Sequence, residues 1–131
     1  MPEYEKYLER AYEVLDSAKI LFENEKYNSS VAQAYYAMFY AAKALLSVKD
    51  IHPKTHRGVI AEFGLEFINK GFIEEMYGKT IAKGLQLRER ADYDVYYKAS
   101  RDEAEDIIKD AERFTERIRE AIDKIVRQST K

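Results

Sequence analysis

The most hydrophobic part of the chain is the run of residues 31–48, VAQAYYAMFYAAKALLSV, in which only Gln33, Lys43 and Ser47 are clearly polar. A helix that is apolar on nearly every side must be covered by other elements on most of them. A membrane span is the alternative, but Lys43 lies inside the run and its three tyrosines need hydrogen-bond partners. We therefore expect the central helix of a packed bundle, with no membrane contact.

An amphipathic helix is expected before this run, because apolar residues recur there every three or four positions. It begins at Pro2, which suits the first turn of a helix, and ends within residues 24–27. Asn28 or Ser29 is then expected to cap the central helix, since both side chains can accept a hydrogen bond from a free backbone N–H.

A third and a fourth helix follow the break at Pro53, which cannot continue a helix. Thr55 is the expected cap of the third helix, and Gly71 is the expected left-handed residue at its end. The fourth helix is expected over residues 73–92, where apolar residues again recur at helical spacing.

The last helix has the clearest start in the chain. Residues 93–99 show no helical pattern, but Ser100 and Glu103 form a capping box, in which each side chain binds the backbone N–H of the other residue. The apolar stripe that follows is nearly a heptad repeat, which also suits pairing with another chain. No segment has a strand pattern. We therefore predict an all-α, up-and-down bundle of four to five helices in one domain, residues 1–131.

The amino-acid composition excludes several kinds of binding site and chemistry. The net charge of -2 and a pI near 5.8 exclude nucleic-acid binding through bulk positive charge, but not a local basic site. The absence of cysteine excludes disulfides, zinc–thiolate sites and thiol nucleophiles. The two histidines and scattered acids make no metal set, and no glycine-rich phosphate loop is present, so no metal or cofactor is expected.

The acidic amphipathic N-terminus is not a secretory signal, which predicts a cytoplasmic protein. Abundant Glu, Lys and Arg suggest a thermophilic source.

Arg88 is the most unusual residue by position. If Ile81 marks the centre of the inner face of the fourth helix, Arg88 lies only about 20° from it, whereas Arg90 lies about 180° away. Arginine is rarely buried without a partner. One interpretation is that Arg88 extends past the helix end and pairs with Asp92, four residues on. The other is a guanidinium that holds a phosphate or carboxylate at a pocket or subunit interface.

Three segments resemble HEPN domains: YYAMFYAAKALL in the second helix, HRGV followed by a Phe in the third, and LRERADYD at the end of the fourth. The closest resemblance is to short stand-alone HEPN-like proteins of archaea and bacteria with an Arg-x-x-Ala-Asp-Tyr signature, here residues 88–93. It extends over essentially the whole chain. It implies a helical bundle that forms a homodimer, with the Arg motif at or near the dimer cleft.

The resemblance implies two kinds of activity. Many HEPN proteins are metal-independent ribonucleases, in which the Arg steadies the scissile phosphate and a His, separated from it by four to six residues, helps the RNA 2′-hydroxyl attack it. Others act with a minimal nucleotidyltransferase in two-gene toxin–antitoxin modules.

This sequence departs from the ribonuclease pattern, because no His follows Arg88 and Tyr93 occupies the corresponding position. A tyrosine, with a pKa of about 10, is a poor base at neutral pH but can donate a hydrogen bond to phosphate. His56, at the start of the third helix, can supply the base only if folding or dimerisation brings it to Arg88. The alternative for His56 is a packed or capping residue. His52 is expected to be exposed.

Tyr93, Tyr96 and Tyr97 follow the motif closely. They either pack the loop against the bundle or a partner, or stack on a base or nucleotide. Some HEPN–nucleotidyltransferase pairs suggest a further role, in which Tyr96 or Tyr97 is adenylylated and the toxin is thereby neutralised.

Three functional hypotheses remain. The first is a HEPN-like module that acts with a nucleotidyltransferase, with Arg88, Asp92, Tyr96 and Tyr97 contacting RNA or a nucleotide. The second is a helical dimer with a scaffolding or ligand-binding role. The third is a ribonuclease with a degenerate motif, in which Arg88, Tyr93 and His56 carry the chemistry. We rank them in this order.

Overall fold

The computed structural model describes residues 2–129 and contains helices and loops but no strand in this range. The elements are α1 (Glu3–Glu23), α2 (Tyr27–Val48), α3 (His56–Phe63), the π-helical turn η1 (Gly64–Ile68), α4 (Glu75–Tyr93) and α5 (Arg101–Ser129). The all-α prediction is confirmed.

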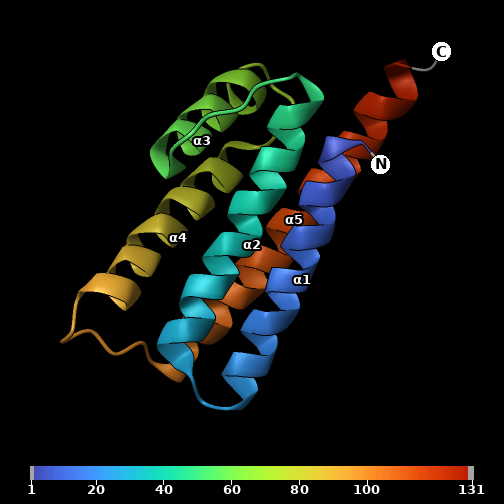
Figure 1. Cartoon of the computed structure of the whole chain (residues 1–131). Helices are drawn as coiled ribbons and strands as arrows, with labels where there is room; N and C mark the ends of the chain where they lie inside the picture. The colour runs from blue at the N-terminus through green and yellow to red at the C-terminus, as the bar shows by residue number, and fades with distance from the viewer. Residues whose placement is uncertain (1, 130–131) are drawn as a thin grey trace.

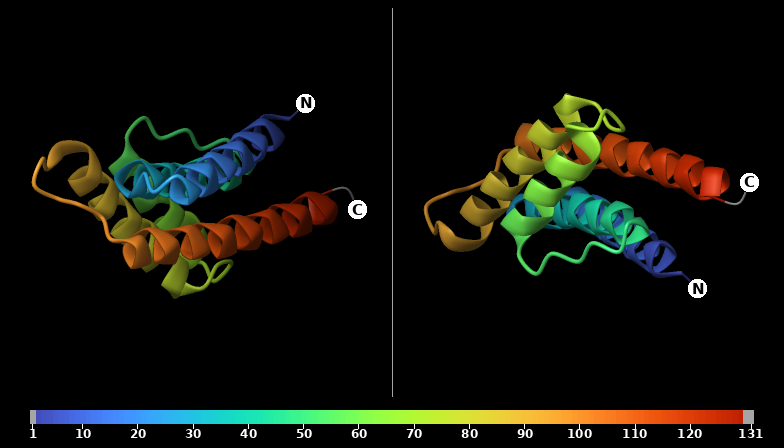
Figure 2. Two further views of the ribbon diagram at one scale, coloured as in Figure 1. Left: turned by 90° about the horizontal axis from the view of Figure 1, so that it is seen from below. Right: turned by 90° about the horizontal axis from the view of Figure 1, so that it is seen from above.

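The long helices alternate in direction, as in an up-and-down bundle (Figure 1). The central helix is α2, which packs against α1, α3, α4 and α5. In Figure 1, α1 lies on one side of α2, α3 and α4 lie on the other, and α5 passes behind. The start of α1 and the end of α5 lie at the same end of the bundle (Figure 2). None of the helices in residues 2–129 is long and apolar enough to cross a membrane.

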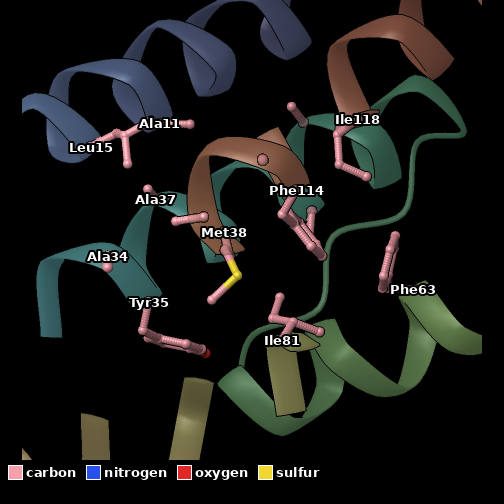
Figure 3. Packing of buried hydrophobic residues seen from close by; sticks show 14 of the residues in the cluster. Ala11, Leu15, Ala34, Tyr35, Ala37, Met38, Phe63, Ile81, Phe114 and Ile118 are labelled. Carbon is pink, nitrogen blue, oxygen red and sulfur yellow. The ribbon is translucent and has the colours of Figure 1, made fainter. Parts of the chain in front are cut away.

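The core is built around α2, as the sequence predicts. Met38 of α2, Ile81 of α4 and Phe114 of α5 are fully buried, and their side chains point toward one another (Figure 3). Gly84 allows α4 to come close to α2, because a Cβ atom there would lie 2.8 Å from the Met38 side chain and 3.3 Å from the Tyr35 ring. This close approach sets the place of the residues that follow Gly84 in α4, including Arg88.

Three local predictions are confirmed. The Thr55 hydroxyl accepts the Gly58 N–H at 2.9 Å at the start of α3. Gly71 has a φ of 83°, in the left-handed region. At the start of α5, the Glu103 carboxylate accepts the Ser100 N–H at 3.1 Å, and the Ser100 hydroxyl accepts the Glu103 N–H at 3.0 Å.

The predicted cap of α2 is wrong. The helix begins at Tyr27, before Asn28 and Ser29, and its N-cap position makes no side-chain hydrogen bond. Asn28 instead binds the loop between α4 and α5: its side-chain oxygen accepts the Ala99 N–H at 2.7 Å, and its NH₂ group donates to the Tyr97 carbonyl at 3.1 Å. The first turn of α2 therefore holds the loop that follows the Arg88 motif. The fourth helix also begins later than predicted, at Glu75 rather than residue 73.

Candidate functional site

Arg88 points into the bundle from the last two turns of α4. It is only 7% exposed, whereas Arg90 is exposed, as the helical geometry predicts. The guanidinium carbon lies 5.4 Å from the centre of the Tyr36 ring, 5.8 Å from Tyr35 and 5.9 Å from Tyr93. These distances are those of cation–π contacts, so three tyrosine rings surround one buried cation.

The polar partners of Arg88 are weak. Its Nη1 donates to the Asp92 carboxylate and to the Tyr93 hydroxyl, both at 3.4 Å. Charge-assisted bonds of this kind are usually about 2.7–2.9 Å long. The Arg88 Nε atom is buried and has no hydrogen-bond partner among the described residues. Arg88 therefore keeps donor capacity that the protein does not use, since a guanidinium has five N–H groups.

The Arg88 guanidinium stays protonated and positively charged. Burial tends to lower its pKa, but Tyr36, Tyr93 and Asp92 act in the opposite direction, and the net result is a pKa above the ordinary value. Asp92 itself is more than a third exposed on its side chain. As an anion beside the guanidinium, Asp92 is suited to orient Arg88 rather than to contact a phosphate directly.

His56 lies near Arg88 within a single chain. Its Nδ1 is 2.8 Å from the Tyr35 hydroxyl, and its ring centre is 4.3 Å from that of Phe39 and 5.8 Å from that of Tyr36. Tyr35 and Tyr36 also face Arg88. Folding alone therefore places His56 and Arg88 against the same two tyrosines of α2, without help from a second subunit.

The His56 ring is neutral at pH 7. Burial lowers its pKa, the charges of Arg88 and Lys43 lower it further, and Glu89 only partly opposes them. Burial also raises the pKa of Tyr35 well above its ordinary value, so its hydroxyl keeps its proton. A neutral His has one N–H donor and one acceptor. If Nδ1–H donates to Tyr35, Nε2 is free to act as a base; if Tyr35 donates to Nδ1, Nε2 carries the proton.

We expect the stability of the protein to fall in mild acid because of His56. Its pKa in the folded chain lies below the ordinary 6.5, so the unfolded chain takes up a proton first as the pH falls. The stabilising contribution is complete above about pH 6.5 and is lost as the pH falls through the lower, folded pKa. Urea unfolding of wild type and His56→Gln at several pH values measures this. If both proteins lose the same stability on acidification, His56 is not responsible.

The tyrosines after the motif have three different environments. Tyr93 is 75% exposed and contacts Arg88, Tyr96 is 92% exposed, and Tyr97 is half-buried with its hydroxyl donating to the Glu103 carboxylate at 3.2 Å. The backbone N–H of Tyr96 donates to the Asp94 side chain at 3.0 Å, which fixes the turn but leaves the ring in solvent. The end of α4 thus presents Tyr93 to the site, and the loop that follows presents Tyr96 to solvent.

The structure also shows where the second histidine, His52, lies and whether acidic and histidine side chains gather. His52 is exposed and lies 2.9 Å from the Asp50 carboxylate, outside the Arg88 site. Within the described part of the chain, no three His, Asp or Glu side chains are grouped as a metal site. For Tyr35 and Tyr36, two of the three tyrosines in the run 31–48, the apolar pattern predicted packing alone. The signal for a second role was their position on the helix that had to pack against Arg88.

A family model described as the HEPN domain matches residues 4–121. The chain belongs to the HEPN domain family. It is 52% identical over 119 residues to the protein named "Putative toxin MJ0605" from Methanocaldococcus jannaschii, covering 91% of this chain and 88% of that protein. It is 36% identical over 131 residues to a "UPF0332 protein" of Thermotoga maritima, covering 97% and 99%.

A solved structure shares the fold of this chain. The protein TT1696 from Thermus thermophilus superposes with a TM-score of 0.78 and covers 92% of this chain and 99% of its own length. At 18% identity, this likeness concerns the fold alone. The match of the HEPN family model to residues 4–121 confirms the resemblance expected from the three sequence segments.

Proposed function

We propose that this HEPN protein is the toxin component of a two-gene module, acting with a minimal nucleotidyltransferase, and that Arg88 is its phosphate-binding residue for RNA or a nucleotide. The observation that carries the phosphate site is the buried Arg88 guanidinium, whose Nε has no partner in the described chain and whose two polar contacts are 3.4 Å long. Family membership and the printed toxin name of the Methanocaldococcus jannaschii protein support the toxin role.

A phosphate group would satisfy Arg88 where the protein does not. Two phosphate oxygens match the fork of a guanidinium, and Tyr93 is placed to donate a further hydrogen bond. Asp92 lies 3.4 Å from the guanidinium, so a phosphate bound at about 2.7–2.9 Å would add the closer contact that the free protein lacks. The exposed ring of Tyr93 beside the site also suits stacking with a base. We further propose a homodimer in which two such sites face a shared cleft.

If a nucleotidyltransferase partner adenylylates this protein, we expect the modified residue to be Tyr96. Its ring is almost fully exposed, whereas the Tyr97 hydroxyl is bonded to Glu103 and its pKa is raised by burial and by that carboxylate. The test is incubation with the product of the neighbouring reading frame and ATP, followed by peptide mass spectrometry. Tyr96→Phe should abolish the added mass, and Tyr97→Phe is the matched control.

This experiment also tests the proposed module. A neighbouring frame without the Gly-Ser and paired-Asp signature of a nucleotidyltransferase removes most of the support for a partner. Modification that persists in Tyr96→Phe and disappears in Tyr97→Phe contradicts the choice of tyrosine but leaves the module intact.

One observation favours a second candidate function, a metal-independent ribonuclease. His56 lies against the same tyrosines as Arg88 and is neutral, which is the state that a general base requires. This function predicts cleavage of an end-labelled, mixed-sequence RNA in the presence of a chelator, lost in both His56→Ala and Arg88→Ala. Without cleavage by the wild type, the phosphate site serves binding or a partner-dependent step.

A further inference from the structure

Lys43 is the only charged residue of α2, and nothing in the Arg88 site accounts for it. It is half-buried, and its Nζ lies 5.2 Å from the centre of the Tyr7 ring and 5.3 Å from that of Phe39. Its contacts are with aromatic rings, and it forms no ion pair with a carboxylate in residues 2–129. Within residues 2–129, the positive charge of Lys43 therefore has no anionic partner.

An aromatic strip, formed by Tyr36, Phe39 and His56, connects Lys43 with Arg88. Phe39 contacts Lys43 at one end, and its ring centre lies 4.3 Å from His56 and 6.4 Å from Tyr36. Tyr36 in turn lies under the Arg88 guanidinium at 5.4 Å. Both cations also lower the pKa of His56, whose ring packs on Phe39 and Tyr36. Tyr36 and Lys43 are seven residues apart on α2, or about 10 Å along the helix axis.

The charges around the strip favour an anionic ligand. Asp92 faces Arg88 only at 3.4 Å, and Glu89 is engaged by Arg57 at 3.2 Å. The chain as a whole has a net charge of -2, so a strip with a cation at each end is a local departure from the average. Aromatic faces between cations that can bind phosphates are the usual surface for single-stranded nucleic acid, because bases stack while the backbone is neutralised.

We propose that Lys43 forms a second phosphate subsite, and that the ligand is a single strand of RNA whose backbone passes from Arg88 to Lys43 with a base stacked on the aromatic strip. This inference rests on the proposed function of Arg88 as a phosphate site. A lone phosphate or a mononucleotide engages Arg88 only. A strand of several nucleotides engages both cations, since their places on the strip are about two helical turns apart.

The competing explanation is structural. Lys43 contacts Tyr7 of α1 and Phe39 of α2, so its role could be to hold these two helices together through cation–π contacts. Another explanation is that a second copy of this chain covers the strip in a dimer. The salt dependence of RNA binding separates these explanations, because a structural contact or a subunit interface does not change the number of phosphates that the protein neutralises.

The experiment measures the affinity for a short, labelled single-stranded RNA of mixed sequence over a series of salt concentrations. Each phosphate contact with a single strand contributes about 0.7 to the slope of log affinity against log salt. We expect Lys43→Met, which keeps the length of the side chain, to weaken binding and make the slope shallower by about 0.7. Lys43→Arg should retain the wild-type slope. Lys124→Met, at an exposed position of α5, is the matched control and should bind as the wild type does.

The outcomes distinguish this inference from the proposed function. If Arg88→Ala loses RNA binding while Lys43→Met keeps the wild-type slope, the Lys43 subsite is overturned and the Arg88 site stands. If the wild type does not bind the RNA, the Lys43 subsite is overturned and RNA is excluded as the ligand of Arg88, which leaves a nucleotide as its only proposed ligand. If Lys43→Met changes the mass measured by light scattering but keeps the wild-type slope of log affinity against log salt, Lys43 belongs to a subunit interface. If Lys43→Met and Lys43→Gln both fail to fold, Lys43 is a structural clamp and the subsite is overturned.

Discussion

Arg88→Ala is expected to abolish growth arrest when the chain is produced in a bacterial host without its partner. The proposed toxic action depends on a phosphate held by the Arg88 guanidinium, and alanine removes every donor that could bind it. Arg90→Ala is the matched control, because Arg90 is two residues away on the same helix but lies in solvent. We expect Arg90→Ala to arrest growth as the wild type does, at equal protein levels measured by immunoblot.

The same substitution should change the fold little. Arg88 is held by two long hydrogen bonds and by ring contacts, and its loss leaves Asp92 in contact with solvent rather than buried without a partner. Since Asp92 stays in contact with solvent and mainly the ring contacts are lost, we expect a loss of about 0.5–3 kcal/mol in the free energy of unfolding, the range of an ordinary substitution. Arg88→Lys should not restore activity, since lysine lacks the planar fork. An unfolded Arg88→Ala protein would instead assign Arg88 to the core.

The largest effect on stability is expected for Phe114→Ala. Phe114 is fully buried on α5, with its ring centre 5.5 Å from Phe63 of α3 and 6.1 Å from Tyr77 of α4. Replacing such a side chain by alanine typically costs about 3–5 kcal/mol, a large part of the 5–15 kcal/mol by which a domain is stable. Urea unfolding of wild type and variant gives this difference directly.

Ile20→Ala is the control for this measurement, because Ile20 is 59% exposed and should change stability by less than about 0.5 kcal/mol. Phe114 joins α5 to the helices that carry His56 and Arg88, so its loss should also weaken the site. A loss below about 1 kcal/mol in Phe114→Ala would contradict the packing of α3 and α4 on α5.

The features that the sequence predicted well are local ones. The caps at Thr55 and Ser100 depend on residues three positions away, and the inward direction of Arg88 depends only on the angle between successive residues of one helix. The central place of α2 followed from its lack of a polar face. For such features, the chemistry of a few neighbouring residues decides the structure.

The features that were missed connect distant parts of the chain. The bond between Tyr35 and His56 joins residues 21 apart, and the bond from Asn28 to Ala99 joins residues 71 apart. Asn28 was expected to cap α2 because that role needs no distant partner, but the loop at Ala99 offered a buried backbone N–H that required an acceptor. Neither helical periodicity nor capping rules predict how α2 packs against α3 and α4, and this packing brings His56 onto Tyr35, Tyr36 and Phe39.

Binding of single-stranded RNA to Arg88→Ala and Arg90→Ala tests most directly whether Arg88 is the phosphate site. A hydrogen-bonded ion pair contributes about 1.5–3 kcal/mol, so Arg88→Ala should bind at least about tenfold more weakly than the wild type. Arg90→Ala should bind nearly as tightly as the wild type. Equal affinity of Arg88→Ala and wild type at low salt would show that the buried guanidinium serves the fold and not a ligand.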